Sequence, residues 1–87
     1  MGGQGGGDYL TSCNAYCDAY IAAACPSPTY TSANECKSFE CGSIPSTASA
    51  ACKAATKTFY DCERTQADIC ADTGCYNQFL ALVTACQ

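Results

Sequence analysis

Cysteine constrains this chain more than any other residue, because ten cysteines occur among its 87 residues. A domain of this length buries only about 60 to 65% of the surface of its unfolded chain, so a hydrophobic core alone stabilises it marginally. The even cysteine count and the absence of histidine favour disulfide bonds over a metal site. We predict disulfides throughout, with no metal and no other cofactor, although about 945 pairings are possible. The participants are Cys13, Cys17, Cys25, Cys36, Cys41, Cys52, Cys62, Cys70, Cys75 and Cys86.

The closing segment, CYNQFLALVTACQ, shows how these cysteines must be used. Cys75 and Cys86 are eleven residues apart, which in a helix is close to three turns and about 16 Å along the axis. A disulfide requires the two Cα atoms to lie within about 7 Å. The two cysteines therefore cannot pair with each other across a straight helix. We predict that each pairs with another element, so that the last helix is held at both ends.

The first helix is the strongest secondary-structure prediction. Residues 1–7 are rich in glycine and read as a flexible tail ahead of a helical domain over residues 8–87. Asp8 is a suitable N-cap, and Pro26 is expected to stop the helix after Cys25. Its apolar face consists of Tyr9, Leu10, Cys13, Tyr16, Cys17, Tyr20, Ile21 and Ala24.

Three further helical segments follow. Ser32 and Glu35 form a capping-box pair that opens a short helix, which Gly42 ends. The third helix is predicted to place Lys53, Lys57 and Arg64 toward solvent. Its end is predicted either near Gln66 or nearer Cys70. Its predicted inner face consists of Ala48, Cys52, Ala55, Phe59, Cys62 and Gln66. Asp72 or Thr73 caps the last helix, whose predicted inner stripe is Cys75, Phe79, Leu82, Val83 and Cys86. The fold class is all-α, a small disulfide-rich helical bundle of three longer helices and one short helix with antiparallel neighbours.

Charge and hydropathy exclude several classes of partner. The net charge is −4, and the only cations are Lys37, Lys53, Lys57 and Arg64, which form no dense basic patch for nucleic acid. The longest apolar runs, 21–25 and 79–83, are too short to cross a bilayer, so we predict no direct membrane insertion. No signal peptide is recognisable, and a mature or recombinant form of a secreted, extracellular protein is expected.

Catalytic arrangements are poorly supported. Without histidine, Ser–His and Cys–His nucleophile pairs are impossible, and we predict that the protein is not an enzyme and has no catalytic residues. Asp61 and Glu63 point about 160° apart on a helix and are interpreted as solvated surface charges. Cys13 and Cys17 share one helix face, as in helical copper(I) stores, but two disulfides to neighbouring segments are the favoured interpretation.

Tyrosine is the remaining informative residue type. Packing at the rim of the bundle with the hydroxyl in water is the favoured interpretation. The alternative is a contact surface, because tyrosine is enriched at binding hot spots. The receptor-contact candidates are Tyr9, Tyr16, Tyr30, Tyr60 and Tyr76.

The segment DTGCYNQFLALVTAC resembles the closing helix of the mating pheromones of Euplotes-type ciliates, small acidic helical proteins rich in cysteine. The matching residues are Thr73, Gly74, Cys75, Tyr76 and Cys86, and the longer, ten-cysteine branch is similar in length and charge. The resemblance implies a secreted, diffusible signal that binds a membrane receptor on a target cell through exposed helix faces. It also implies self-association, as a homo-oligomer, through such faces.

Two other classes of function remain open at this stage. A lipid or sterol carrier also uses a disulfide-tied helical shell, around an apolar cavity. A tethered bacterial surface module is the other alternative, with Met1 in the place of a lipid-bearing cysteine ahead of the GGQGGG linker.

Overall fold

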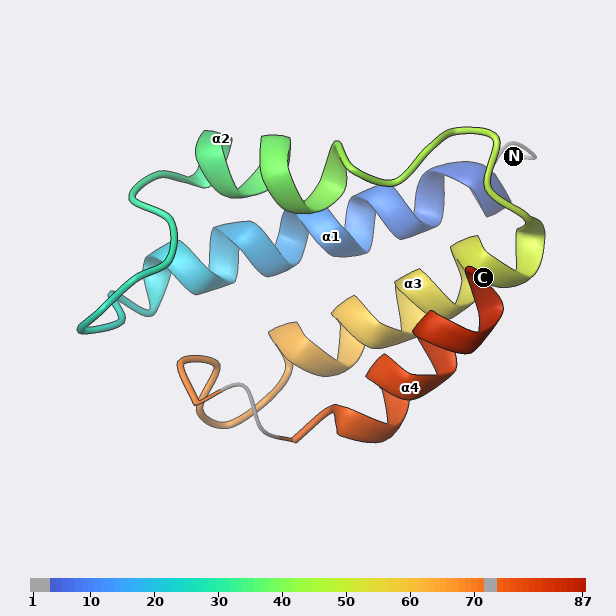
Figure 1. The fold of residues 1–87 in the computed structure, drawn as a ribbon. Helices are drawn as coiled ribbons and strands as arrows, with labels where there is room; N and C mark the ends of the chain where they lie inside the picture. Colours follow the sequence, from blue (N-terminus) through green and yellow to red (C-terminus); the bar gives the residue numbers. More distant parts are fainter. Residues whose placement is uncertain (1–3, 72–73) are drawn as a thin grey trace.

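The protein is all-α, a small helical bundle held by disulfides, in a computed structural model that describes residues 4–71 and 74–87 (Figure 1). No strand occurs among these described residues. The elements are α1 (Gln4–Ala22), α2 (Ala33–Cys36), the π-helical turn η1 (Lys37–Cys41), α3 (Ala50–Arg64) and α4 (Tyr76–Ala85).

The helices pack pairwise in the order α2/η1, α1, α3 and α4. α1 packs against α2 and η1 on one side and against α3 on the other, while α4 packs against α3 (Figure 1). α1, the continuous α2/η1 segment, α3 and α4 alternate in direction along the chain, so the predicted antiparallel arrangement holds for α1 with α2/η1 and for α3 with α4 but not for the packed pair α1 and α3. α1 and α3 run in the same direction, because α2, η1 and the following loop carry the chain back to the starting end.

Both ends of α1 differ from the sequence-based prediction. The helix begins at Gln4 rather than after Asp8, so the glycines at 5–7 lie in its first turn. Each residue added to an existing helix gains one backbone hydrogen bond, which lets the packed part extend into a weak helical sequence. α1 ends at Ala22, three residues before Cys25, and Ala24 takes a left-handed conformation with φ 52°. Pro26 disfavours helical geometry at Cys25, which moves the stop upstream.

The predicted cap of the short helix is confirmed. Ser32 Oγ accepts a hydrogen bond from the Glu35 amide at 3.0 Å. Glu35 Oε1 accepts from the amide of Thr31 at 2.7 Å, one residue before the position that a capping box would use. The helix ends at Gly42, as predicted, but through a π-helical turn in which the Gly42 amide donates to the Lys37 carbonyl at 3.0 Å.

This π-helical turn aligns two cysteines with their partners. Residues five apart in an α-helix differ by about 140° around the axis, so Cys36 and Cys41 would face different directions. The wider turn of η1 brings both toward α1, where Cys13 and Cys17 are one turn apart. The resulting disulfides, Cys13–Cys41 and Cys17–Cys36, have Cα separations of 5.7 and 5.6 Å.

The prediction that α4 is held at both ends is also confirmed. Cys75 pairs with Cys62 near the end of α3, and Cys86 pairs with Cys52 near its start. A fifth disulfide, Cys25–Cys70, joins the loop after α1 to the loop after α3. The ten cysteines thus form five disulfides.

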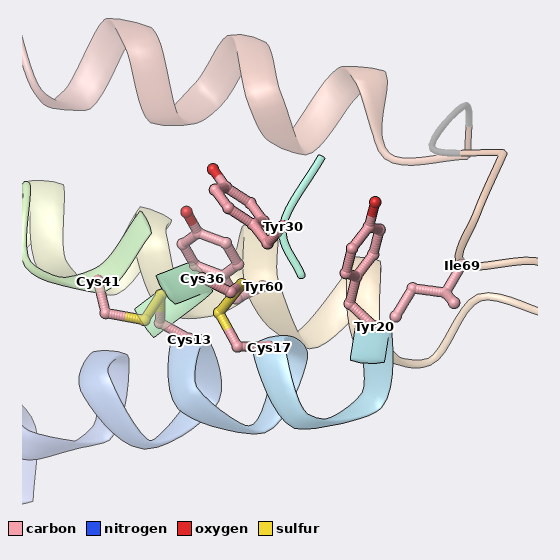
Figure 2. Packing of buried hydrophobic residues seen from close by; sticks show 8 residues of the cluster. All are labelled: Cys13, Cys17, Tyr20, Tyr30, Cys36, Cys41, Tyr60 and Ile69. Atoms are coloured by element: carbon pink, nitrogen blue, oxygen red, sulfur yellow. A yellow bond between two sulfur atoms is a disulfide. The ribbon is translucent and has the colours of Figure 1, made fainter. Parts of the chain in front are cut away.

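The core consists mainly of sulfur and tyrosine. Figure 2 shows the two disulfides between α1 and the α2/η1 segment beside the rings of Tyr20, Tyr30 and Tyr60. Ile69 is the only large aliphatic side chain that is buried among the described residues. The hydrophobic contribution to stability is therefore modest, and covalent ties carry a large part of it.

The buried face of α3 differs from the prediction. The helix starts with Ser49 as N-cap, ends at Arg64, and buries Cys52, Thr56, Tyr60 and Glu63. The predicted inner residues Ala55, Phe59 and Cys62 are half-buried, while Tyr60, placed off the inner stripe, is 6% exposed. α3 lies between α1 and α4, so two of its faces are covered, which single-face periodicity does not anticipate. The predicted caps of the last helix, Asp72 and Thr73, lie outside the described residues.

Replacement of glycine by alanine is sterically more costly at Gly42 than at Gly74. A Cβ at Gly42 would clash with the backbone carbonyl oxygen of Ser38, whereas one at Gly74 would meet the side-chain Oε1 of Gln66 at 2.7 Å, which a rotation of that side chain can relieve at the cost of its hydrogen bond from the Gly74 amide. We expect Gly42→Ala to destabilise the protein by about 1–3 kcal/mol, and Gly74→Ala to have a smaller effect. Guanidinium denaturation of the two variants measures the difference; equal midpoints would contradict it.

The disulfide Cys62–Cys75 is expected to stabilise the docking of α4. It closes a loop with a sequence separation of 13, for which the chain-entropy model gives about 3 kcal/mol. In Cys62→Ala/Cys75→Ala, we expect a lower melting temperature and faster amide hydrogen exchange in α4 than in α1. Equal acceleration of amide hydrogen exchange in α1 and α4 would show that the docking of α4 on α3 does not depend specifically on this disulfide.

Candidate functional site

α4 exposes a stripe of large apolar side chains. Tyr76, Phe79, Leu80 and Val83 are 65, 45, 44 and 42% exposed, and their spacing of three, four and seven residues places them on one face. We call these four residues the α4 stripe. Single exposed apolar residues are ordinary, whereas an exposed apolar helix face is typical of a binding surface.

The stripe is exposed because α4 has only one helix beside it. α4 packs against α3 alone, and no residue from Tyr76 to Ala85 is buried. The predicted inner stripe is therefore wrong for the exposed residues Phe79, Val83 and Cys86, while Cys75 is buried and Leu82 is half-buried. Disulfides at both ends hold α4 in place without burial of its most apolar face.

A cavity of about 300 Å³ adjoins the stripe, and Phe79 belongs to both. We call it the α3–α4 cavity, although α1 and η1 also contribute to its walls. Its lining residues are Tyr16, Glu40, Phe59, Tyr60, Glu63, Phe79 and Leu82.

Glu40 connects three segments beside this cavity. Its Oε2 accepts a hydrogen bond from the hydroxyl of Tyr30 at 2.5 Å, and its Oε1 accepts one from the hydroxyl of Tyr60 at 2.6 Å. Burial, and then these hydrogen bonds, raise the pKa of both phenols well above the usual tyrosine range. Glu40 thereby ties η1 to α3 and to the loop that carries Tyr30.

A larger cavity, of about 480 Å³, lies under the loop after α1 and shares Tyr16 and Glu40 with the α3–α4 cavity. Pro26, Thr29 and Ile69 are among its other walls. The hydroxyl of Tyr20 in this region accepts from the Thr29 amide at 2.7 Å.

The five tyrosines proposed as receptor contacts occupy different environments. Tyr9, Tyr30 and Tyr60 are only 4, 8 and 6% exposed, so these three lie in the interior and leave little surface for a partner. Tyr16 is half-buried at the wall of both cavities, and Tyr76 is exposed in the α4 stripe. The rim interpretation, with hydroxyls in water, is wrong for Tyr30 and Tyr60, because both hydroxyls donate a hydrogen bond to Glu40.

Leu80 was missed by the sequence reasoning, which followed the cysteines along α4. The spacing of Tyr76, Phe79, Leu80 and Val83 was visible in the sequence as a second apolar face. The pairing of Cys75 with Cys62 and of Cys86 with Cys52 turns the cysteine-bearing face of α4, rather than this second face, toward α3.

The acidic residues of α3 behave differently from one another. Asp61 Oδ2 lies 2.6 Å from Lys57 Nζ and its Oδ1 lies 3.0 Å from Arg64 Nε. Burial by itself would raise the pKa of Asp61, but hydrogen bonds from Lys57, Ser12 and Arg64 outweigh it and lower the pKa to about 2. Glu63 is 3% exposed, so its prediction as a solvated surface charge is wrong.

Comparison with known protein families, with curated proteins and with solved structures finds no match to this chain. Within residues 4–71 and 74–87, no group of three or more histidine, cysteine, aspartate or glutamate side chains is arranged to hold a metal ion. No helix in the same ranges combines the length and apolarity that a bilayer crossing requires.

Tyr30 and Tyr60 are expected to ionise only at higher pH than free tyrosine. Since their pKa values are raised in the folded state, their contribution to stability is fully present below about pH 10 and declines as the pH rises further. Glu40→Gln should move the ionisation of both phenols to lower pH in a titration of absorbance at 295 nm. Glu35→Gln, the same change at an exposed position, is the control; the charge of Glu35 contributes least to raising the pKa of Tyr30, so this variant should shift the curve much less than Glu40→Gln. Identical curves for both variants would contradict the role of Glu40.

Proposed function

We propose that this protein is a secreted, diffusible signal that binds a cell-surface receptor through the α4 stripe, as a mating pheromone does. The observation that carries the proposal is the exposed apolar face of Tyr76, Phe79, Leu80 and Val83, none of which belongs to the buried core cluster. Tyrosine and phenylalanine are enriched at the cores of protein interfaces, and the burial of apolar side chains such as leucine and valine favours association.

The disulfides support secretion and a fixed shape. Five such bonds in a small chain are typical of proteins in an oxidising compartment, and here they include both ends of α4. A surface that is already held in one arrangement loses little conformational entropy on binding. Exposed side chains can then vary between related signals while the covalent scaffold remains the same.

The segment that resembles ciliate pheromones coincides with this surface. Gly74 and Cys75 precede α4, Tyr76 is the first residue of the stripe, and Cys86 closes the helix. Thr73 of the same motif lies outside the described residues. The proposed activity involves no catalytic step and no cofactor, and it needs a receptor on the target cell rather than insertion into the membrane.

A lipid or sterol carrier is less well supported. Glu40 and tyrosines line both cavities, and an alkyl chain placed there would desolvate the Glu40 carboxylate without offering it a hydrogen bond. A stoichiometric lipid in an organic extract of the purified protein would reverse this preference. The tethered bacterial module depends on residues 1–3, which lie outside the described residues.

Starved ciliates of several mating types provide the direct test. Fluorescently labelled protein should bind saturably to cells of at least one type and induce pairing or growth. Absence of both binding and response in every type, at any dose, would reject the pheromone assignment.

The α4 stripe should determine this binding. We expect Leu80→Gln/Val83→Gln to weaken binding to responsive cells by roughly ten-fold or more, since two apolar contacts of the interface are lost. Asn77→Gln/Thr84→Gln, a double change at exposed positions of the same helix, should leave binding unchanged. Equal binding by the two double variants would locate the receptor contact elsewhere.

Self-association through the same stripe is part of the proposal, and sedimentation velocity of both variants measures it.

A further inference from the structure

The α3–α4 cavity combines aromatic rings with carboxyl groups. Four of its walls are the rings of Tyr16, Phe59, Tyr60 and Phe79, and two are the side chains of Glu40 and Glu63. Leu82 completes the lining. Its volume of about 300 Å³ lies at the lower end of the range for small-molecule sites, enough for one extended side chain.

The rings form a continuous wall. The ring centres of Tyr16 and Tyr60 are 5.4 Å apart, those of Tyr60 and Phe59 are 5.0 Å apart, and those of Phe59 and Phe79 are 6.1 Å apart. The faces of such rings attract cations through their quadrupole, and they also accept the methylene groups of a long side chain.

Glu40 adds a negative charge with unused capacity. Its two oxygens each accept one hydrogen bond from an uncharged phenol, Tyr30 or Tyr60. A carboxylate offers about four lone-pair positions, so further donors can bind to the same group. Hydrogen bonds between a cationic donor and a carboxylate are about twice as strong as those between neutral groups.

The cations of this chain are engaged at other places. None of the four lines the α3–α4 cavity, although the protein as a whole carries a net charge of −4. Lys37 pairs with Asp18 at 3.0 Å, Lys57 and Arg64 pair with Asp61, and Lys53 lies 5.8 Å from the ring centre of Tyr9.

We propose that the α3–α4 cavity binds a guanidinium or ammonium group at the end of an apolar stem, supplied as an arginine or lysine side chain of the receptor. The inference rests on the proposed function and specifies the chemistry of the partner. The charged group lies at Glu40 and the aromatic wall, and the stem lies along Phe79 and Leu82. Because Phe79 also belongs to the α4 stripe, a partner seated on the stripe can place one side chain in the cavity.

Small probes test the cavity on the purified protein without cells. Nα-acetyl-arginine amide should shift the NMR signals of the Phe59 and Phe79 rings in a saturable manner. Nα-acetyl-citrulline amide has nearly the same shape without the charge, and its affinity should be lower by about five-fold or more. Equal effects of the two probes, or no effect of either, would overturn the proposal.

Variants separate the carboxylate from the aromatic wall. Glu40→Gln should lower the affinity for the arginine probe by about five-fold, whereas Glu35→Gln, outside the cavity, should not change it. Phe79→Leu retains apolar volume and removes a π face at a partly exposed position, and about a two- to five-fold loss is expected. If Glu40→Gln alters the near-ultraviolet circular dichroism, Phe79→Leu decides the outcome. Unchanged affinity in Phe79→Leu would then overturn the proposal.

A peptide distinguishes a receptor side chain from a free organic cation. A short peptide with one arginine flanked by leucines should bind more tightly than the amino-acid amide, and Leu80→Gln/Val83→Gln should remove only this gain. Equal affinities, unaffected by the stripe variant, would overturn the side-chain assignment in favour of a free cation. Probe binding that persists while labelled protein fails to bind cells would reject the proposed function alone.

Discussion

The disulfide bonds between neighbouring helices are the constraint on which the rest of this structure depends. Two fix the α2/η1 segment to α1, two fix α4 to α3, and Cys25–Cys70 ties the two loops at one end of the bundle. Between them the interior is filled with tyrosine rings and sulfur, and Ile69 is the only large aliphatic side chain buried in the described ranges. A chain of this size would otherwise need most of its apolar residues inside.

Covalent attachment explains why large apolar side chains remain outside. Phe39 and the four members of the α4 stripe are exposed, although phenylalanine, leucine and valine are usually among the most buried residue types. α4 does not need its apolar face for attachment, because Cys62–Cys75 and Cys52–Cys86 hold its two ends. The same face is therefore available to a partner, and it is presented in one fixed orientation.

Glu40 gives this scaffold a polar centre next to the stripe. It belongs to η1, the π-helical turn that also brings Cys36 and Cys41 toward α1. The hydroxyls of Tyr30 and Tyr60 donate hydrogen bonds to Glu40, which also lines the α3–α4 cavity together with Phe79 and Leu82 of α4. Under the proposal made above, this combination of apolar residues with a carboxylate and aromatic rings selects a partner that is itself apolar and basic.

Local physical rules in the sequence determined the helices, the Ser32 cap, the stop at Gly42 and the separate partners of Cys75 and Cys86, because helix rise and hydrogen-bonding geometry do not depend on distant residues. Periodicity also identified which side chains share a face. Only the tertiary structure decided which cysteines pair, and hence that α3 is covered on two faces, that Tyr30 and Tyr60 meet Glu40, and that Phe79, Leu80 and Val83 stay exposed. A helical repeat describes directions around one axis, whereas burial depends on which other helices are placed against it.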